Sequence, residues 1–179
     1  MNPTLKMFID GWFADNPVFV ALLCALPALV MPERAKTAVA TAIRLGAVFA
    51  TIAVAGGLLA AALPSPMLPL VVLAGTATGI GLLRVWGELR GEWAGLPKSV
   101  LVLAPLAALQ LRVAELPGMA EAMPVAGGAA LGFAWAFIAL GAIREAVRIA
   151  ECDPVFKTLP VMLFSMGMFA LALYGFVLL

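Results

Sequence analysis

Hydrophobic residues gather in six stretches along the chain, and the segments between them hold most of the charged residues. The stretches cover residues 17–31, 37–63, 67–83, 99–111, 123–143 and 159–179. A helix that crosses a bilayer needs roughly 20 mainly apolar residues. The first and fourth stretches are shorter than that, and each contains a proline, Pro27 and Pro105. The pattern predicts an all-α, polytopic membrane protein with about six transmembrane helices.

The two halves of the chain, residues 16–84 and 98–179, show the same order of a short interrupted segment, a long helix and another helix. Short, proline-containing segments at corresponding positions favour broken helices around a midplane site in an inverted repeat. We therefore expect one membrane domain, 16–179, made of two inverted three-helix repeats whose first and fourth helices are broken. Residues 1–15 predict an amphipathic segment in the headgroup zone, which is either an ordinary anchored terminus or a binding element.

The composition agrees with a membrane protein: 12% of the residues are charged, 64% are hydrophobic, and the mean hydropathy is +1.10. A soluble domain carries roughly 25% charged residues. The net charge of +1 implies no nucleic-acid partner. The chain has no histidine, which excludes histidine-ligated haem, histidine zinc sites and a Ser-His-Asp triad within it. Cys24 and Cys152 are too few for a disulfide framework.

Basic residues lie mainly in alternate loops. The loops after the first, third and fifth stretches hold eight of the eleven basic residues, namely Arg34, Lys36, Arg84, Arg90, Lys98, Arg144, Arg148 and Lys157. Short loops rich in Lys and Arg stay in the cytoplasm. We therefore predict a multi-pass protein of the bacterial inner membrane with both termini on the non-cytoplasmic side.

Arg44 is the basic residue that lies clearly inside an apolar stretch. An arginine at mid-membrane costs about 2.5–3.5 kcal/mol on insertion scales, and less where it can snorkel. Arg44 is either a snorkelling, structural arginine or one that faces a cofactor, a lipid or a partner subunit. No carboxylate lies in the middle of a predicted helix, so a self-contained ion pump is not expected.

Two pairs of glycines lie four residues apart, Gly75 with Gly79 and Gly128 with Gly132. Small residues at this spacing let helix backbones approach closely in a membrane. The pairs are explained either by packing within the chain or by a seam between subunits.

Three segments resemble the Rnf/Nqr membrane-subunit family: NPVFVALL (16–23) followed by Pro27, LGAIREAVR (140–148), and FKTLPVMLFSMGMFALALYGF (156–176). The last segment is similar to the subunits RnfA and NqrE, and the first is closer to RnfE and NqrD. The resemblance covers nearly the whole chain in order and in helix number. It implies a six-helix, inverted-repeat protein that pairs with a subunit of opposite orientation. Such pairs belong to ion-translocating complexes that pass electrons from NADH or ferredoxin towards quinone or NAD.

In that family each member of a pair supplies two cysteines, one from each broken helix, to an iron–sulfur centre between the subunits. Here the corresponding positions are Leu26 and Leu111, and leucine cannot ligate iron. Gln110 stands where the family has an asparagine. Cys24 is two residues before Leu26, roughly 200° round a helix, so it is a buried apolar residue or else a relocated ligand. Cys152 is expected to be a free cytoplasmic thiol.

The resemblance and its departures together predict an integral membrane subunit of an electron-transport complex that is structural and has no cofactor, metal or catalytic residue of its own. Its partners would be the lipid bilayer and other membrane subunits, in a hetero-complex that includes a pseudo-twofold partner as one arrangement. One alternative is a non-redox accessory or assembly subunit of another membrane complex. The other is a small-solute transporter, which rests only on the broken helices and the inverted repeat.

Overall fold

The computed structural model describes residues 3–14, 27, 35–89, 92–93, 96–116, 118–150 and 159–177. These residues are almost entirely helical, which confirms the all-α prediction. The elements are α1 (Pro3–Ile9), the π-helix η1 (Asp10–Ala14), α3 (Ala35–Ala62), the 3-10 turn η2 (Ser65–Met67), α4 (Leu68–Val85), β1 (Glu92–Trp93), β2 (Leu96–Pro97), α5 (Lys98–Ala114), α6 (Met119–Ile149) and α7 (Leu159–Val177). The two short strands pair antiparallel in the loop between α4 and α5.

Three helices in the described part of the chain are long and apolar enough to cross a membrane. They cover Lys36–Leu59 in α3, Leu68–Val85 in α4 and Met119–Ile149 in α6. The chain is therefore a membrane protein. Helix α5 has 17 residues, and α7 contains a shorter apolar stretch, Pro160–Ala172. The first predicted stretch lies outside the described residues except for Pro27.

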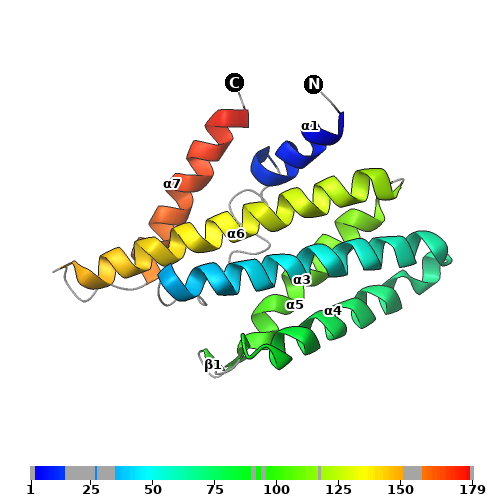
Figure 1. The fold of residues 1–179 in the computed structure, drawn as a ribbon, viewed down its shortest axis with the longest axis horizontal. Coiled ribbons are helices and arrows are strands. Elements are labelled where there is room, and N and C mark those ends of the chain that lie inside the picture. The colour runs from blue at the N-terminus through cyan, green and yellow to red at the C-terminus, as the bar shows by residue number, and fades with distance from the viewer. Residues whose placement is uncertain are drawn as a thin grey trace.

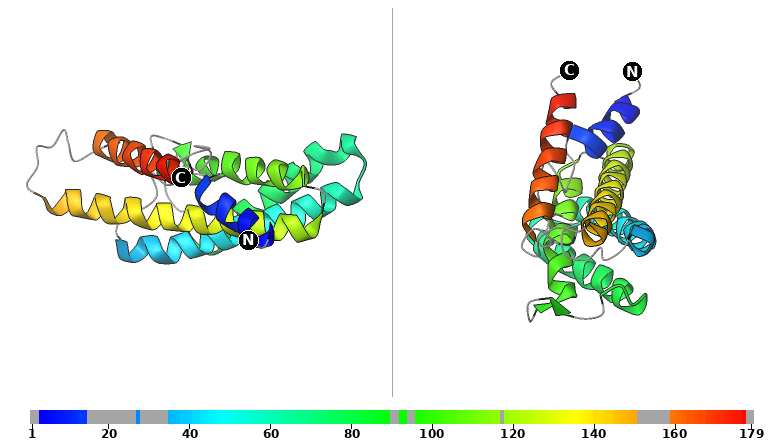
Figure 2. Two further views of the ribbon diagram at one scale, coloured as in Figure 1. Left: turned by 90° about the horizontal axis from the view of Figure 1, so that it is seen from above. Right: turned by 90° about the vertical axis from the view of Figure 1, so that its left-hand side faces the viewer.

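Helices α3 and α6 run antiparallel at the centre of the molecule (Figure 1). Helices α4 and α5 pack on the α3 side, whereas α1, η1 and α7 pack on the α6 side (Figure 2). The central pair approaches closely because its facing residues are small: a Cβ added at Gly46 would lie 3.2 Å from the carbonyl oxygen of Ala130. Larger side chains fill the space beside this contact, where the ring centroids of Phe49 and Phe133 are 4.9 Å apart and those of Phe133 and Phe137 are 5.5 Å apart.

The structure differs from the predicted break in the fourth apolar segment. Residues Lys98–Ala114 form one continuous helix, α5, with Pro105 inside it and buried. A proline removes one backbone hydrogen bond and bends a helix. The packing of α5 against both α3 and α4 stabilises a helix that continues through Pro105. The transporter hypothesis rested on broken helices and the inverted repeat, and α5 supplies no break.

The start of α3, the end of α4, the start of α5 and the end of α6 all lie towards one side of the bundle, on the left in Figure 1. This basic end carries Lys36, Arg84, Lys98 and Arg148. This arrangement agrees with the alternation of basic loops along the sequence. The assignment of the basic end to the cytoplasm stays a prediction.

Candidate functional site

Helix α5 lies in a trough formed by four glycines of α3 and α4, which are Gly56, Gly57, Gly75 and Gly79. The residues of α5 that enter this glycine trough are Leu106, Gln110 and Val113, whose spacing of four and three puts them on one helix face. A Cβ added at Gly79 would lie 3.1 Å from the Leu106 Cδ1 atom, and one added at Gly57 would overlap Val113. The missing side chains therefore make the space that α5 occupies.

Gln110 is the polar side chain at the centre of the glycine trough. It is only 1% exposed, and its Nε2 atom donates to the carbonyl oxygen of Leu106 at 3.2 Å. Within the described part of the chain, no donor lies at hydrogen-bonding distance from its Oε1 atom. A Cβ at Gly56 would lie 2.7 Å from Oε1, and one at Gly75 would overlap it. The amide oxygen is thus enclosed by two glycine backbones, whose Cα–H groups are weak donors.

A second polar group forms at the basic end, where α4 terminates in a glycine turn. Gly87 has a φ of 78°, a left-handed conformation that glycine adopts without strain. Its N–H donates to the carbonyl of Arg84 at 3.0 Å, and the N–H of Glu88 donates to the carbonyl of Leu83 at 3.1 Å. This is the Schellman pattern of helix termination. The turn directs the side chain of Glu88 towards α3.

The Glu88 carboxylate receives two donors from α3. Thr41 Oγ1 donates to Oε2 at 2.6 Å, and Arg44 Nη1 donates to Oε1 at 2.5 Å. The Glu88 side chain is 11% exposed and that of Arg44 is 49% exposed. We call these three residues the Arg44 cluster. The structure thus gives Arg44 a structural partner and leaves half of its side chain at the surface.

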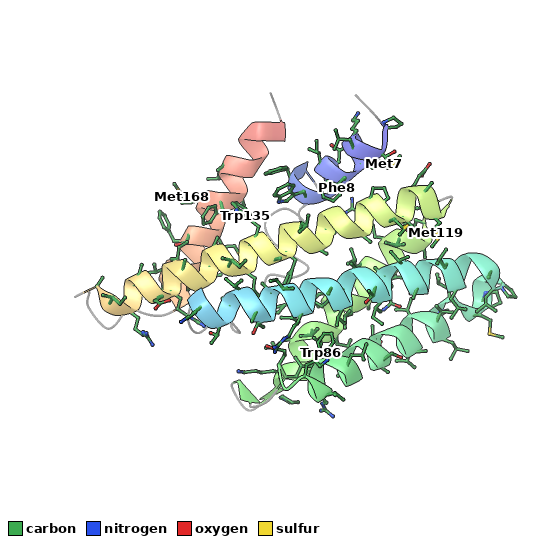
Figure 3. The ribbon with its side chains drawn as sticks, in the orientation of Figure 1. Met7, Phe8, Trp86, Met119, Trp135 and Met168 are labelled. Carbon is green, nitrogen blue, oxygen red and sulfur yellow. The ribbon has the colours of Figure 1, made fainter. Side chains whose placement is uncertain are left out.

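The N-terminal segment packs on the second predicted glycine pair. A Cβ at Gly128 would overlap the carbonyl oxygen of Phe8 and lie 3.1 Å from the backbone nitrogen of Trp12. From the other side, a Cβ at Gly11 would lie 3.0 Å from the carbonyl oxygen of Val125. Figure 3 shows Phe8 between α1 and α6. Gly128 therefore receives the backbone of α1 and η1, and Gly132 is also buried on α6.

The positions that the sequence resemblance would make metal ligands are only partly described. Leu26, Cys24 and Cys152 lie outside the described residues. Leu111 follows the buried Gln110 on α5, and its side chain is 44% exposed. With Val100 and Leu103, which are 48% and 49% exposed, it forms an apolar strip that we call the outer strip of α5. Among the described residues, no three His, Cys, Asp or Glu side chains gather as a metal site.

The sequence pattern singled out Arg44 and Gly75 but missed their neighbours, which are Glu88 and Gln110 respectively. The sequence pattern assigns Glu88 to a loop. Gly87 immediately before it is nevertheless a signal for a turn that ends a helix. Gln110 is a polar residue near the end of the fourth apolar stretch, where its neighbours Leu109 and Leu111 are both apolar, and that contrast was the available signal.

Comparison of the sequence with protein families and with curated proteins found no match. The assignment of a function therefore depends on the sites described above and on the resemblance of the three segments.

Proposed function

We propose that this chain is an integral membrane subunit of an electron-transport complex of the Rnf/Nqr type, in which it has a structural role and holds no iron–sulfur centre. The observation that carries the proposal is the position of Leu111. Its neighbour Gln110 enters the glycine trough, whereas the Leu111 side chain is 44% exposed on the outer face of α5.

An iron–sulfur centre shared by two subunits needs its ligands on the outer surface of each subunit. Position 111 has such a location, but it carries an apolar side chain that cannot bind iron. Val100 and Leu103 continue the apolar surface along the same helix. The outer strip of α5 therefore suits close packing against a partner helix, in which leucines fill the volume that a cluster would occupy.

The arrangement of the two central helices supports the six-helix, inverted-repeat part of the proposal. Helix α3 is the second segment of the first half, and α6 is the second segment of the second half. They run antiparallel against each other (Figure 1), as equivalent helices of an inverted repeat do. We extend the proposal accordingly to a pair of such subunits in the bacterial inner membrane, with both termini on the non-cytoplasmic side.

Site-specific photo-crosslinking tests the proposal. A photoreactive residue replaces Leu111 in the membrane-bound protein, and a matched probe replaces Leu73, which is 65% exposed on α4. The crosslinked species are purified in mild detergent and identified by mass spectrometry. We expect Leu111, and not Leu73, to capture a membrane subunit that co-purifies with flavin- or iron-containing proteins. Equal labelling of lipid from both positions would remove the support for a subunit interface.

A second candidate is a non-redox accessory or assembly subunit of another membrane complex, and the leucine at position 111 favours it. A subunit without redox ligands can use the same interface to hold a complex that transfers no electrons. Deletion of the gene separates the two functions. The electron-transport role predicts loss of NADH- or ferredoxin-linked electron transfer in isolated membranes. The accessory role predicts that this activity survives while another membrane complex dissociates.

A further inference from the structure

Arg44 combines a deep position with a half-exposed side chain. It lies eight residues inside the membrane-spanning part of α3 that begins at Lys36, which is about 12 Å along the helix at 1.5 Å per residue. Ile43 beside it is 61% exposed and Val39 is 42% exposed, so this face of α3 is otherwise apolar. The Arg44 guanidinium group reaches Glu88, just beyond the end of α4, so the charge lies towards the headgroups, where it has access to lipid phosphates.

The Arg44 cluster fixes the guanidinium group and leaves most of its donors available. Glu88 accepts from Nη1 of Arg44, and Thr41 holds the other carboxylate oxygen. A guanidinium group has five N–H donors in a planar fork. Among the described residues, Glu88 is the acceptor that Arg44 contacts. The carboxylate is 11% exposed and the arginine side chain 49% exposed, so the outer surface of the pair presents mainly N–H groups.

The charges near this cluster favour an anion. Arg44 and Glu88 neutralise each other, whereas Lys36, two turns earlier on α3, and Arg84, one turn before Glu88 on α4, are both exposed. Apolar residues next to Arg84 in the chain are also exposed, with Val85 81% exposed and Trp86 48% exposed at the end of α4; Trp86 is labelled in Figure 3. A ligand that matches this surface has a negatively charged head and apolar chains.

We propose that the Arg44 cluster is a binding site for the phosphate of an anionic phospholipid in the leaflet at the basic end. The free edge of the Arg44 guanidinium donates to the phosphate oxygens, Lys36 and Arg84 supply the positive potential, and the acyl chains follow Ile43 and Val85. Glu88 and Thr41 keep the guanidinium in place. The site does not depend on which complex the chain belongs to.

Native mass spectrometry of the purified, delipidated full chain tests the site by titration with phosphatidylglycerol. We expect Arg44→Gln to raise the dissociation constant about fivefold to tenfold, since one basic group near the surface accounts for a change of that size. Arg148→Gln removes an equal charge from an exposed position on α6 at the same end and should change the constant less than twofold. Wild-type protein should bind phosphatidylcholine more weakly than phosphatidylglycerol.

Two further measurements separate local binding from net charge and from folding. Arg44→Gln leaves Glu88 without its cation, so the measurement is repeated with Arg44→Gln/Glu88→Gln, which has the wild-type net charge and no unpaired carboxylate. The double variant should bind as weakly as Arg44→Gln. Wild-type affinity in this double variant, or an equal loss in Arg148→Gln, would overturn the proposal. Inorganic phosphate should not displace the lipid, and binding of inorganic phosphate with the same affinity would show a site for the free anion.

Discussion

The contact between Gln110 and the glycine trough makes the sharpest prediction about how this protein is held together. At an open helical position, replacement of glycine by alanine stabilises a helix by about 0.5–1 kcal/mol. At Gly75 the added Cβ would overlap Gln110 Oε1 and lie 2.9 Å from its Cδ. The glutamine has little room to move away, because the backbone of Gly56 lies close on its other side, where an added Cβ would be 2.7 Å from Oε1. Overpacking of this kind costs typically about 1–3 kcal/mol.

A matched control removes the effect of helix propensity. Gly81 lies on the same helix, and a Cβ added to it would meet nothing within 4 Å. Gly75→Ala should therefore be less stable than Gly81→Ala by about 1–3 kcal/mol, the overpacking term alone. The assay is reversible unfolding in mixed micelles, in which SDS is titrated into the folded protein and helix content is followed by far-ultraviolet circular dichroism.

The double variant Gly75→Ala/Gln110→Ala tests whether the clash with Gln110 is the cause. Shortening Gln110 makes room for the new methyl group and removes an amide oxygen that lacks a donor among the described residues. We expect the double variant to recover at least about 1 kcal/mol relative to the sum of the two single changes. Additivity within about 0.5 kcal/mol, or equal stability of Gly75→Ala and Gly81→Ala, would refute the reasoning.

Two other contacts lead to equally direct tests. Gly128→Ala places a Cβ on the carbonyl oxygen of Phe8, whereas Gly127→Ala makes only an ordinary 3.6 Å contact with the Phe8 ring. Only Gly128→Ala should therefore release the N-terminal segment, which would be seen as faster protease cleavage of that segment. Equal cleavage of the two variants would contradict the packing described. Phe133→Ala empties a fully buried site and should cost about 3–5 kcal/mol through lost burial and cavity formation, measured by the same unfolding assay. Phe164→Ala, at a 70% exposed position, should change stability little.

The apolar pattern was sufficient to find the long helices. It predicted residues 37–63 and 67–83, and the structure has α3 at Ala35–Ala62 and α4 at Leu68–Val85. In a bilayer, backbone groups must bond within their own segment, so a long apolar stretch has few alternatives to a helix. The pattern predicted 123–143 for the fifth segment, but α6 covers Met119–Ile149. The extension occurs because residues such as Glu121, Glu145 and Arg148 end the apolar run without ending the helix.

The partners of the polar residues could not be read from the sequence. Arg44 was evident as a basic residue in an apolar stretch, but its acceptor, Glu88, is 44 residues away in the chain. The contact exists because α3 and α4 pack side by side and because the left-handed Gly87 turns the chain back at the end of α4. Both conditions belong to the tertiary structure.

Which face of each helix points inward was also decided by the tertiary structure alone. On α5, Leu109 is 7% exposed and Leu111 is 44% exposed, although the two residues are chemically identical. In water, hydrophobicity distinguishes the inside of a protein from the outside, but lipid tails are as apolar as leucine, so the same pattern serves both faces. The sequence by itself thus determined that the chain forms membrane helices with close-packing glycines. Only the packing of those helices decided that Gly75 receives Gln110 and that Leu111 faces outward.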